Sequence, residues 1–181
     1  GPSVLVANHV GYLDPMVLLA QLPAVPIAKR ELSAWPVVGP TIGALGVVMV
    51  RRGDPYDGAR ALRHAMRALE GGTNVLVFPE GTTSRGNRVL PLRRGVFGIA
   101  RRLGVPVVPV VVRYAEPGSA WVDDDWFLPH YLRTLGRSTV TAHVQFCDAV
   151  QSEGAPAELA RFVRARMQAA LEQLVRLPLA A

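Results

Sequence analysis

The sequence predicts an α/β fold, in which a mostly parallel or mixed central sheet is flanked by helices on both faces. Short apolar runs recur along the chain with helix-like segments between them, as expected for strands covered on both sides. The runs are SVLVA at 3–7, GVVMV at 46–50, NVLVF at 74–78 and VPVVPVVV at 105–112. A chain of 181 residues can bury one sizeable core, so we expect a single domain over residues 1–181.

Two segments have the spacing of amphipathic helices. Residues 54–72 open on Asp54-Pro55, a favourable helix start, and close on a glycine pair after apolar residues at helical spacing. Residues 156–177 have one apolar face, formed by Leu159, Phe162, Val163, Met167, Ala170, Leu171 and Leu174. We expect this second helix to pack on the domain, although a basic amphipathic helix can also lie on a membrane.

The remaining segments are less regular. Residues 139–146 alternate apolar and polar side chains, which predicts a half-exposed strand near the sheet edge. Residues 115–137 are the least regular stretch of the chain. Residues 32–50 are uncharged and nearly long enough to span a membrane, but five prolines and glycines interrupt them. There we expect a loop, a turn or short helix, and then a buried strand.

The composition is that of an ordinary globular protein with a formal net charge of +6. Such a charge favours anionic partners, which include nucleic acid, membrane surfaces and phosphorylated small molecules. The basic residues are nearly all arginine, which we interpret as compositional bias, and no helix-turn-helix, zinc or stacking-aromatic pattern predicts nucleic-acid binding. Cys147 is the only cysteine, which rules out an internal disulfide and a four-thiolate metal site, and we expect a buried, inert thiol.

The stretch NHVGYLD at 8–14 places an imidazole and a carboxylate five positions apart, directly after an apolar run. His9 therefore falls at the carboxyl end of a predicted strand, where open α/β sheets place reactive groups. Gly11 makes a tight turn between the two residues easy, so Asp14 can reach His9. Its carboxylate would fix the tautomer of a histidine base. The alternative is an ordinary turn, in which Asp14 starts a helix and His9 is structural.

The stretch FPEGTTSRG at 78–86 follows another predicted strand. Glu80 stands at the strand end, Gly81 allows close backbone approach, and the hydroxyls of Thr82 and Ser84 precede an arginine. Such a turn can bind phosphate, although it lacks the P-loop spacing and can equally be a simple strand-to-helix loop. The sequence has no Gly-x-Ser-x-Gly elbow, so a histidine base would activate a hydroxyl that belongs to a substrate.

Four motifs in this order resemble those of the PlsC-like, or lysophosphatidic acid, acyltransferase family. They are Asn8-His9-x-x-x-x-Asp14, GVVMVRR at 46–52, FPEGTTS at 78–84 and VPVVPV at 105–110. The resemblance implies an α/β acyltransferase that moves a fatty acyl group from acyl-CoA or acyl carrier protein to the free hydroxyl of a lysolipid. The implied acceptor is 1-acyl-glycerol-3-phosphate, which gives phosphatidic acid, and neither a metal nor a permanently bound cofactor is implied.

The resemblance also implies roles for individual residues. His9 would remove the acceptor's proton while Asp14 orients it. Arg52 aligns with a family arginine that holds the phosphate-bearing head group, and Lys29 with a lysine between the first two motifs. The expected substrate-binding set surrounds that head group and consists of Lys29, Arg52, Glu80, Gly81, Thr82 and Ser84.

The chain departs from the family pattern in two places. Family members usually have an amino-terminal, often membrane-inserting segment before the first motif; here we expect a peripheral domain on the cytoplasmic face of the cell membrane, or an anchor outside this chain. The segment WVDDDWFLPHYLRTLG at 121–136 looks like one in relatives that acylate lyso-ornithine lipids, whose head group lacks phosphate. The acceptor is therefore open, and a thioester hydrolase and a non-catalytic lipid-binding module are further alternatives.

Overall fold

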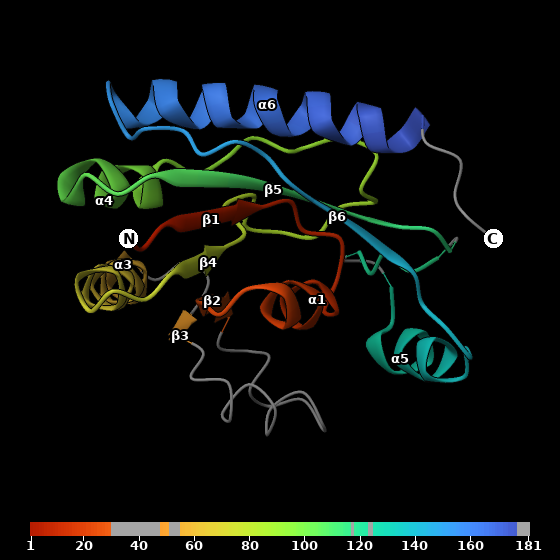
Figure 1. The fold of residues 1–181 in the computed structure, drawn as a ribbon. Helices are drawn as coiled ribbons and strands as arrows, with labels where there is room; N and C mark the ends of the chain where they lie inside the picture. The colour runs from red at the N-terminus through yellow and green to blue at the C-terminus, as the bar shows by residue number, and fades with distance from the viewer. Residues whose placement is uncertain (30–47, 51–54, 117, 123–124, 177–181) are drawn as a thin grey trace.

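The computed structural model describes residues 1–29, 48–50, 55–116, 118–122 and 125–176. A single six-stranded sheet runs through this part of the chain in the order β3-β2-β4-β1-β5-β6 (Figure 1). The strands are β1 (Val4–Ala7), β2 (Val25–Lys29), β3 (Val48–Val50), β4 (Val75–Val77), β5 (Val107–Tyr114) and β6 (Ala142–Phe146). The first five in this order are parallel, and β6 pairs antiparallel with β5 at the edge. The predicted α/β fold with a mixed sheet is confirmed.

The central strands are covered on both faces, as their uninterrupted apolar sequences predict. Side chains at alternate positions of a strand point to opposite faces of the sheet. Val4 and Val6 pack into the larger apolar cluster, whereas Leu5 and Ala7 pack into a smaller one on the other face. All four residues of β1 are buried, so this strand lies at the centre of the core.

Helices pack against both faces of the sheet. The larger cluster receives side chains from α3 (Pro55–Glu70), α4 (Gly95–Leu103) and α6 (Pro156–Arg176). The smaller cluster receives Leu18 from α1 (Asp14–Gln21). Figure 1 shows α6 along one side of the sheet and α1 on the other. None of the helices in the described ranges has the length and apolar character of a membrane span.

Helix α6 packs on the domain, which confirms the first of the two interpretations of its apolar face. Its buried residues are Leu159, Ala160, Val163, Met167, Ala170, Leu171 and Leu174. Phe162 was expected on this face, but that prediction is wrong, because its side chain is 50% exposed and contacts Arg166. Position 162 lies about 100° around the helix from position 163, which turns it away from the sheet.

The strand β2 and the helices α4 and α5 (Phe127–Leu135) were not predicted from the sequence. Strand β2 contains Pro26, and proline lacks the amide that a strand needs for regular pairing. The strand nevertheless pairs with β4 through its first two residues and with β3 through its last three. Helix α5 lies within the stretch that was expected to be irregular. Most of residues 32–50 lie outside the described part of the chain, which includes only the strand β3 at their end.

Candidate active site

The two polar motifs meet at one edge of the sheet because β1 and β4 are adjacent and parallel. Val6 pairs with Val77, so the residues after both strands emerge side by side. Asn8, fully buried, fixes the end of β1 to β5 by donating to the carbonyl of Val112 and accepting from its amide, at 3.0 and 2.8 Å. The strand end that presents His9 is therefore held on both sides.

His9 and Asp14 form a hydrogen-bonded pair across the turn. Nδ1 of His9 lies 2.7 Å from Oδ2 of Asp14, and the Asp14 side chain is completely buried. Because a carboxylate accepts, Nδ1 carries the proton, and Nε2 of the same ring is then the basic nitrogen. The His9 ring stacks on Phe78, with 4.4 Å between ring centroids, and 19% of the side chain is exposed. The ring is thus oriented and still accessible.

Asp14 is held by three further donors. Oδ2 accepts the amides of Val10 and Gly11 at 2.6 and 2.9 Å, and Oδ1 accepts the hydroxyl of Tyr114 at 2.8 Å. Asp14 is the first residue of α1, but no side chain caps this helix, whose N-cap position is Leu13. The carboxylate therefore binds the turn before the helix and does not cap the helix. Asp14 both begins α1 and orients His9, so the two interpretations of this residue are compatible.

The loop after β4 binds the backbone of His9 on both sides. Oε2 of Glu80 accepts the His9 amide at 3.0 Å, and Oε1 accepts the Leu90 amide at 2.8 Å. The amide of Ser84 donates to the His9 carbonyl at 2.8 Å, and the Ser84 hydroxyl lies 3.4 Å from the same oxygen. Glu80 and Ser84 thus fix the peptide groups that carry the imidazole.

Burial shifts the pKa of two groups beside the pair. Burial raises the pKa of Glu80, which two backbone hydrogen bonds partly offset. Burial also raises the pKa of Tyr114 far above its ordinary value, and the Asp14 carboxylate adds to that rise. Tyr114 therefore stays a protonated donor to Asp14 across the whole physiological range.

Gly81 has a backbone conformation that favours glycine. Its φ is +73°, and a Cβ built there would lie 2.7 Å from the guanidinium carbon of Arg93. The arginine end is flexible and could move, so the positive φ is the stronger constraint. Arg93 places a cation beside this turn, for which phosphate binding and a simple strand-to-helix loop were both expected possibilities.

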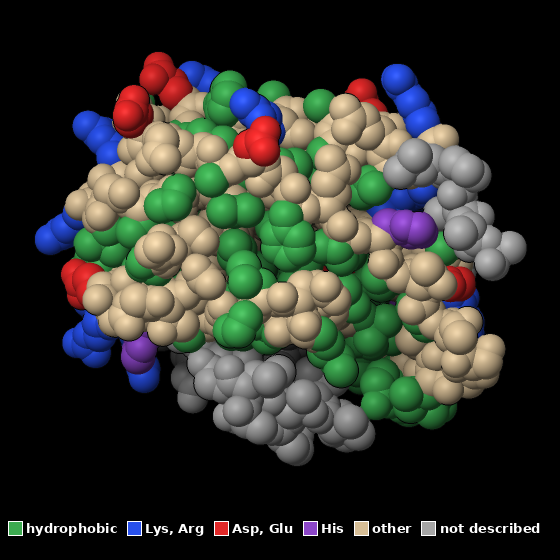
Figure 2. Space-filling view, viewed as in Figure 1, with side chains coloured by type: hydrophobic (Ala, Val, Ile, Leu, Met, Phe, Trp, Pro, Cys, Tyr) green, Lys and Arg blue, Asp and Glu red, His purple; other side chains and the backbone are tan. Residues whose placement is uncertain are grey.

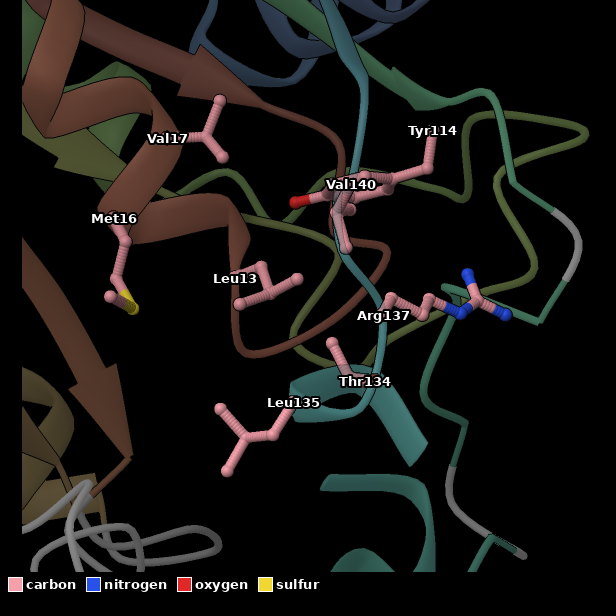
Figure 3. Close-up of a pocket in the computed structure, with 8 residues that line it drawn as sticks. All are labelled: Leu13, Met16, Val17, Tyr114, Thr134, Leu135, Arg137 and Val140. Carbon is pink, nitrogen blue, oxygen red and sulfur yellow. The ribbon is translucent and has the colours of Figure 1, made fainter. Parts of the chain in front are cut away.

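An apolar cavity of about 440 Å³ lies between α1 and the end of α5 (Figure 3). Tyr114 connects the cavity to the pair, since its hydroxyl binds Asp14 and its side chain lines the wall. Arg137 is the one charged residue in the lining, which consists of Leu13, Met16, Val17, Tyr114, Thr134, Leu135, Arg137 and Val140. Across the described segments, no cluster of three metal-ligating side chains occurs.

Comparison with known proteins identifies the family. The family model "Acyltransferase" matches residues 1–113, which contain both polar motifs and the strands that carry them. The chain belongs to this acyltransferase family. The resemblance inferred from the four motifs is thereby confirmed.

The relatives of this chain include enzymes that are named for two different acceptors. Over 176 residues the chain is 32% identical to a lyso-ornithine lipid O-acyltransferase of Pseudomonas aeruginosa, a match that covers 94% of this chain and 68% of the relative. Over 162 residues it is 34% identical to a 1-acyl-sn-glycerol-3-phosphate acyltransferase of Neisseria meningitidis, covering 83% of this chain and 62% of the relative. The chain thus spans about two thirds of each relative's length.

A solved structure has the same fold. The crystal structure of the 1-acyl-sn-glycerophosphate acyltransferase PlsC from Thermotoga maritima matches 99% of this chain and 68% of its own, with a TM-score of 0.70 and 28% identity. The match extends over the sheet and its covering helices. It agrees with the architecture that the apolar runs predicted.

Within this acyltransferase, the predicted site residues are only partly brought together. His9, Asp14, Glu80 and Ser84 form one connected hydrogen-bond network, and Gly81 and Thr82 lie in the same loop. Lys29 is the last residue of β2 and pairs with Val50, but its side chain lies outside the described structure. The same holds for the whole of Arg52.

Sequence reasoning missed Tyr114, Phe78 and Arg93 as parts of the site. Tyr114 ends β5, which pairs with β1, so its position at a carboxyl strand end was an available signal. Phe78 was quoted as part of a motif, but its stacking on His9 depends on the adjacency of β1 and β4. Arg93 is twelve residues after Gly81, and no local pattern marks it.

Proposed function

We propose that the chain transfers an acyl group from an acyl thioester to the free hydroxyl of a lysolipid in phospholipid biosynthesis. The observation that carries this proposal is the 2.7 Å contact between His9 Nδ1 and the buried Asp14 carboxylate. A histidine oriented in this way is a general base, with Nε2 directed at a substrate proton. The acyl donor is acyl-CoA or acyl carrier protein, and no bound metal or permanent cofactor takes part.

In the proposed reaction, His9 first accepts a proton and later returns it. Nε2 of His9 takes the proton of the acceptor hydroxyl while the acceptor oxygen bonds to the thioester carbonyl carbon. The tetrahedral intermediate then collapses, the carbon–sulfur bond breaks, and the imidazolium returns the proton to the leaving thiolate. The Asp14 carboxylate stabilises the imidazolium between these transfers. The products are the acylated lipid and the free thiol, so protons and electrons balance.

Two residues of the expected substrate-binding set receive a different role. Both carboxylate oxygens of Glu80 accept backbone amides, and a carboxylate repels a phosphate. Glu80 and Ser84 therefore act as positioning residues for His9. In this proposal, Lys29, Arg52, Gly81 and Thr82 bind the head group. Arg93, which lies next to Gly81, is a further cation for it.

The acceptor is 1-acyl-glycerol-3-phosphate or a lyso-ornithine lipid. Cations around the FPEGTTS loop favour a phosphate, whereas the match to a lyso-ornithine lipid enzyme extends over 94% of the chain, beyond the family region that ends at 113. Mass spectrometry of the products from a panel of both lysolipids, with coenzyme A and carrier-protein donors, decides between them. We place the reaction at the cytoplasmic face of the cell membrane, where the chain acts as a peripheral or separately anchored domain.

The replacement His9→Ala tests the mechanism. Removal of the base is expected to lower thiol release from acyl-CoA by about 10²–10⁴-fold while far-UV circular dichroism stays unchanged. His64→Ala on α3 is the matched control and is expected to keep wild-type activity. Wild-type activity in His9→Ala would refute the mechanism. Thiol release that needs no added lysolipid would instead identify a thioester hydrolase.

A further inference from the structure

Helix α5 has apolar residues on its outer side as well as its inner side. Leu128 and Leu132 are 62% and 58% exposed, and Leu135 continues the same stripe at helical spacing. Trp126, directly before the helix, is 84% exposed. A stripe of leucines beside an exposed tryptophan is costly in water, and such surfaces mark contacts with a membrane or another protein.

This outer face continues onto α1. Met16 of α1 is half exposed and also lines the apolar cavity, whose other wall includes Leu135. Figure 2 shows hydrophobic side chains gathered over α5 and the neighbouring part of α1. We call the outer α5 face the surface formed by Trp126, Leu128, Leu132, Leu135 and Met16. Met16 and Leu135 belong both to this surface and to the cavity wall, which also contains Tyr114, the hydrogen-bond donor to Asp14.

The inner side of α5 is tied to the catalytic turn. Tyr12 lies between His9 and Asp14, and its hydroxyl is 3.2 Å from Nδ1 of the buried His130. The Tyr12 ring also contacts Phe127 and Tyr131 at centroid distances of 5.4 and 5.9 Å. Whatever binds the outer α5 face therefore lies at a fixed position relative to the catalytic pair.

We propose that the outer α5 face docks on the surface of a lipid bilayer that contains anionic lipids. Trp126 and the leucines match the interfacial and apolar layers of a membrane. Arg133 is exposed on the same helix, about 100° around the helix axis from Leu132, whereas three aspartates at 123–125 precede the opposite end in the sequence. At the carboxyl end of α5, Arg133 lies at the margin of the exposed leucine stripe, and a cation beside an apolar face favours anionic membranes. The inference rests on the proposed function, because a lysolipid acceptor resides in a bilayer.

Vesicle binding by the 181-residue chain tests the proposal. Vesicles of phosphatidylcholine with phosphatidylglycerol are expected to co-sediment the wild type, and Leu128→Ser/Leu132→Ser is expected to weaken this partitioning by about tenfold or more. The matched control is Phe162→Ser/Val175→Ser, which removes two half-exposed apolar residues from α6 and is expected to leave partitioning unchanged. Arg133→Glu is expected to weaken binding to these vesicles but not to vesicles of phosphatidylcholine alone.

Three outcomes would overturn the proposal. One is wild-type co-sedimentation of the double leucine variant with a normal circular dichroism spectrum. Another is an equal loss of binding in the α6 control, which would show a nonspecific apolar effect. The third is a wild type that does not bind vesicles and forms a dimer, together with a leucine variant that is a monomer. This result would show that a second copy of the chain covers the outer α5 face.

An activity measurement separates this proposal from the proposed function. With a short-chain lysolipid dissolved as monomers, the leucine variant is expected to release thiol at the wild-type rate, whereas its rate with vesicle-embedded lysolipid falls. If the wild type acylates neither the dissolved nor the vesicle-embedded lysolipid, the proposed function is refuted, but the docking proposal is not. The vesicle co-sedimentation result would still decide where the chain docks.

Discussion

Asp14 links the chemistry of the site to its construction. One oxygen accepts His9 Nδ1 and two turn amides, and the other accepts the Tyr114 hydroxyl. A buried carboxylate without such donors would cost several kcal/mol, so the turn residues and Tyr114 are what make burial of this charge possible. The same donors fix the carboxylate in the place from which it orients the imidazole.

The replacement Asp14→Asn separates charge from geometry. The amide oxygen can accept from His9 and the two turn amides, and the amide NH₂ can donate to Tyr114, whose hydroxyl then accepts. We therefore expect the free energy of unfolding to fall by only about 1–2 kcal/mol, measured by denaturant titration. Thiol release is expected to fall about 10²–10⁴-fold, because no charge stabilises the imidazolium.

The replacement Asp14→Ala is the comparison for this experiment. It leaves the turn amides and the His9 and Tyr114 donors without a common acceptor, so its free energy of unfolding should fall much further than that of Asp14→Asn. Equal activity of Asp14→Asn and the wild type would show that the carboxylate acts only by position. Equal destabilisation of the two variants would show that the asparagine does not restore the hydrogen bonds.

The site was predictable from sequence where its residues are close along the chain. The His9–Asp14 pair lies within one turn, and its spacing after a predicted strand indicated either a catalytic pair or an ordinary turn. The resemblance to the acyltransferase motifs supplied the expected roles of both residues. Tyr114, one hundred residues from Asp14, reaches the pair only because β1 and β5 are neighbours in the sheet. Glu80 was expected to contact the head group, and its two amide partners depend on the fold and not on a local pattern.

At the scale of elements, the apolar runs predicted β1, β3, β4 and β5, and alternation predicted β6, whereas β2, α4 and α5 were not predicted. Proline in β2 and the mixed aromatic, basic and acidic content around α5 both disfavour the assignment by local propensity. Tertiary contacts decide these cases. In α5, the contacts come from Tyr12 and from His130, whose Nε2 lies 3.0 and 3.1 Å from the carbonyl oxygens of Gly118 and Ala120.

The replacement His130→Ala tests whether these contacts hold α5 on the catalytic turn. Truncation leaves the Tyr12 hydroxyl and two carbonyl groups without this partner and removes a buried ring, so we expect a loss of about 2–4 kcal/mol in unfolding free energy. Amides of residues 125–135 should exchange hydrogen faster, as followed by mass spectrometry. Tyr12→Phe keeps the ring contacts and removes one hydrogen bond, so its effect should be smaller. Unchanged exchange in His130→Ala would contradict this account of α5.

For the whole molecule, the sheet gives the site a rigid base. The strands that end at the catalytic loops are β1, β4 and β5, and their side chains belong to both apolar clusters. The match to the Thermotoga maritima structure extends over 99% of the chain, which agrees with one continuous architecture. That the chain forms a single domain stays a prediction, which coincident unfolding transitions by fluorescence and circular dichroism would test.

The stability of the whole chain should report the Tyr114–Asp14 contact through its pH dependence. The pKa of Tyr114 is raised in the folded state, so above pH ~10 the unfolded chain loses this proton while the folded chain keeps it. The free energy of unfolding therefore falls with rising pH, by up to about 1.4 kcal/mol per pH unit from this group, and its contribution is complete below pH ~10.

The replacement Tyr114→Phe removes both this slope and the donor to Asp14. We expect the variant to be about 1–3 kcal/mol less stable than the wild type at neutral pH, because Oδ1 of Asp14 loses its hydrogen bond. The two stability curves should then converge as pH rises above ~10, when urea unfolding is measured at successive pH values. Tyr56→Phe, which removes an exposed phenol, should keep the wild-type dependence. A difference between wild type and Tyr114→Phe that stays constant through this range would show that Tyr114 titrates alike in the folded and unfolded chain, and that its hydroxyl is not held by Asp14.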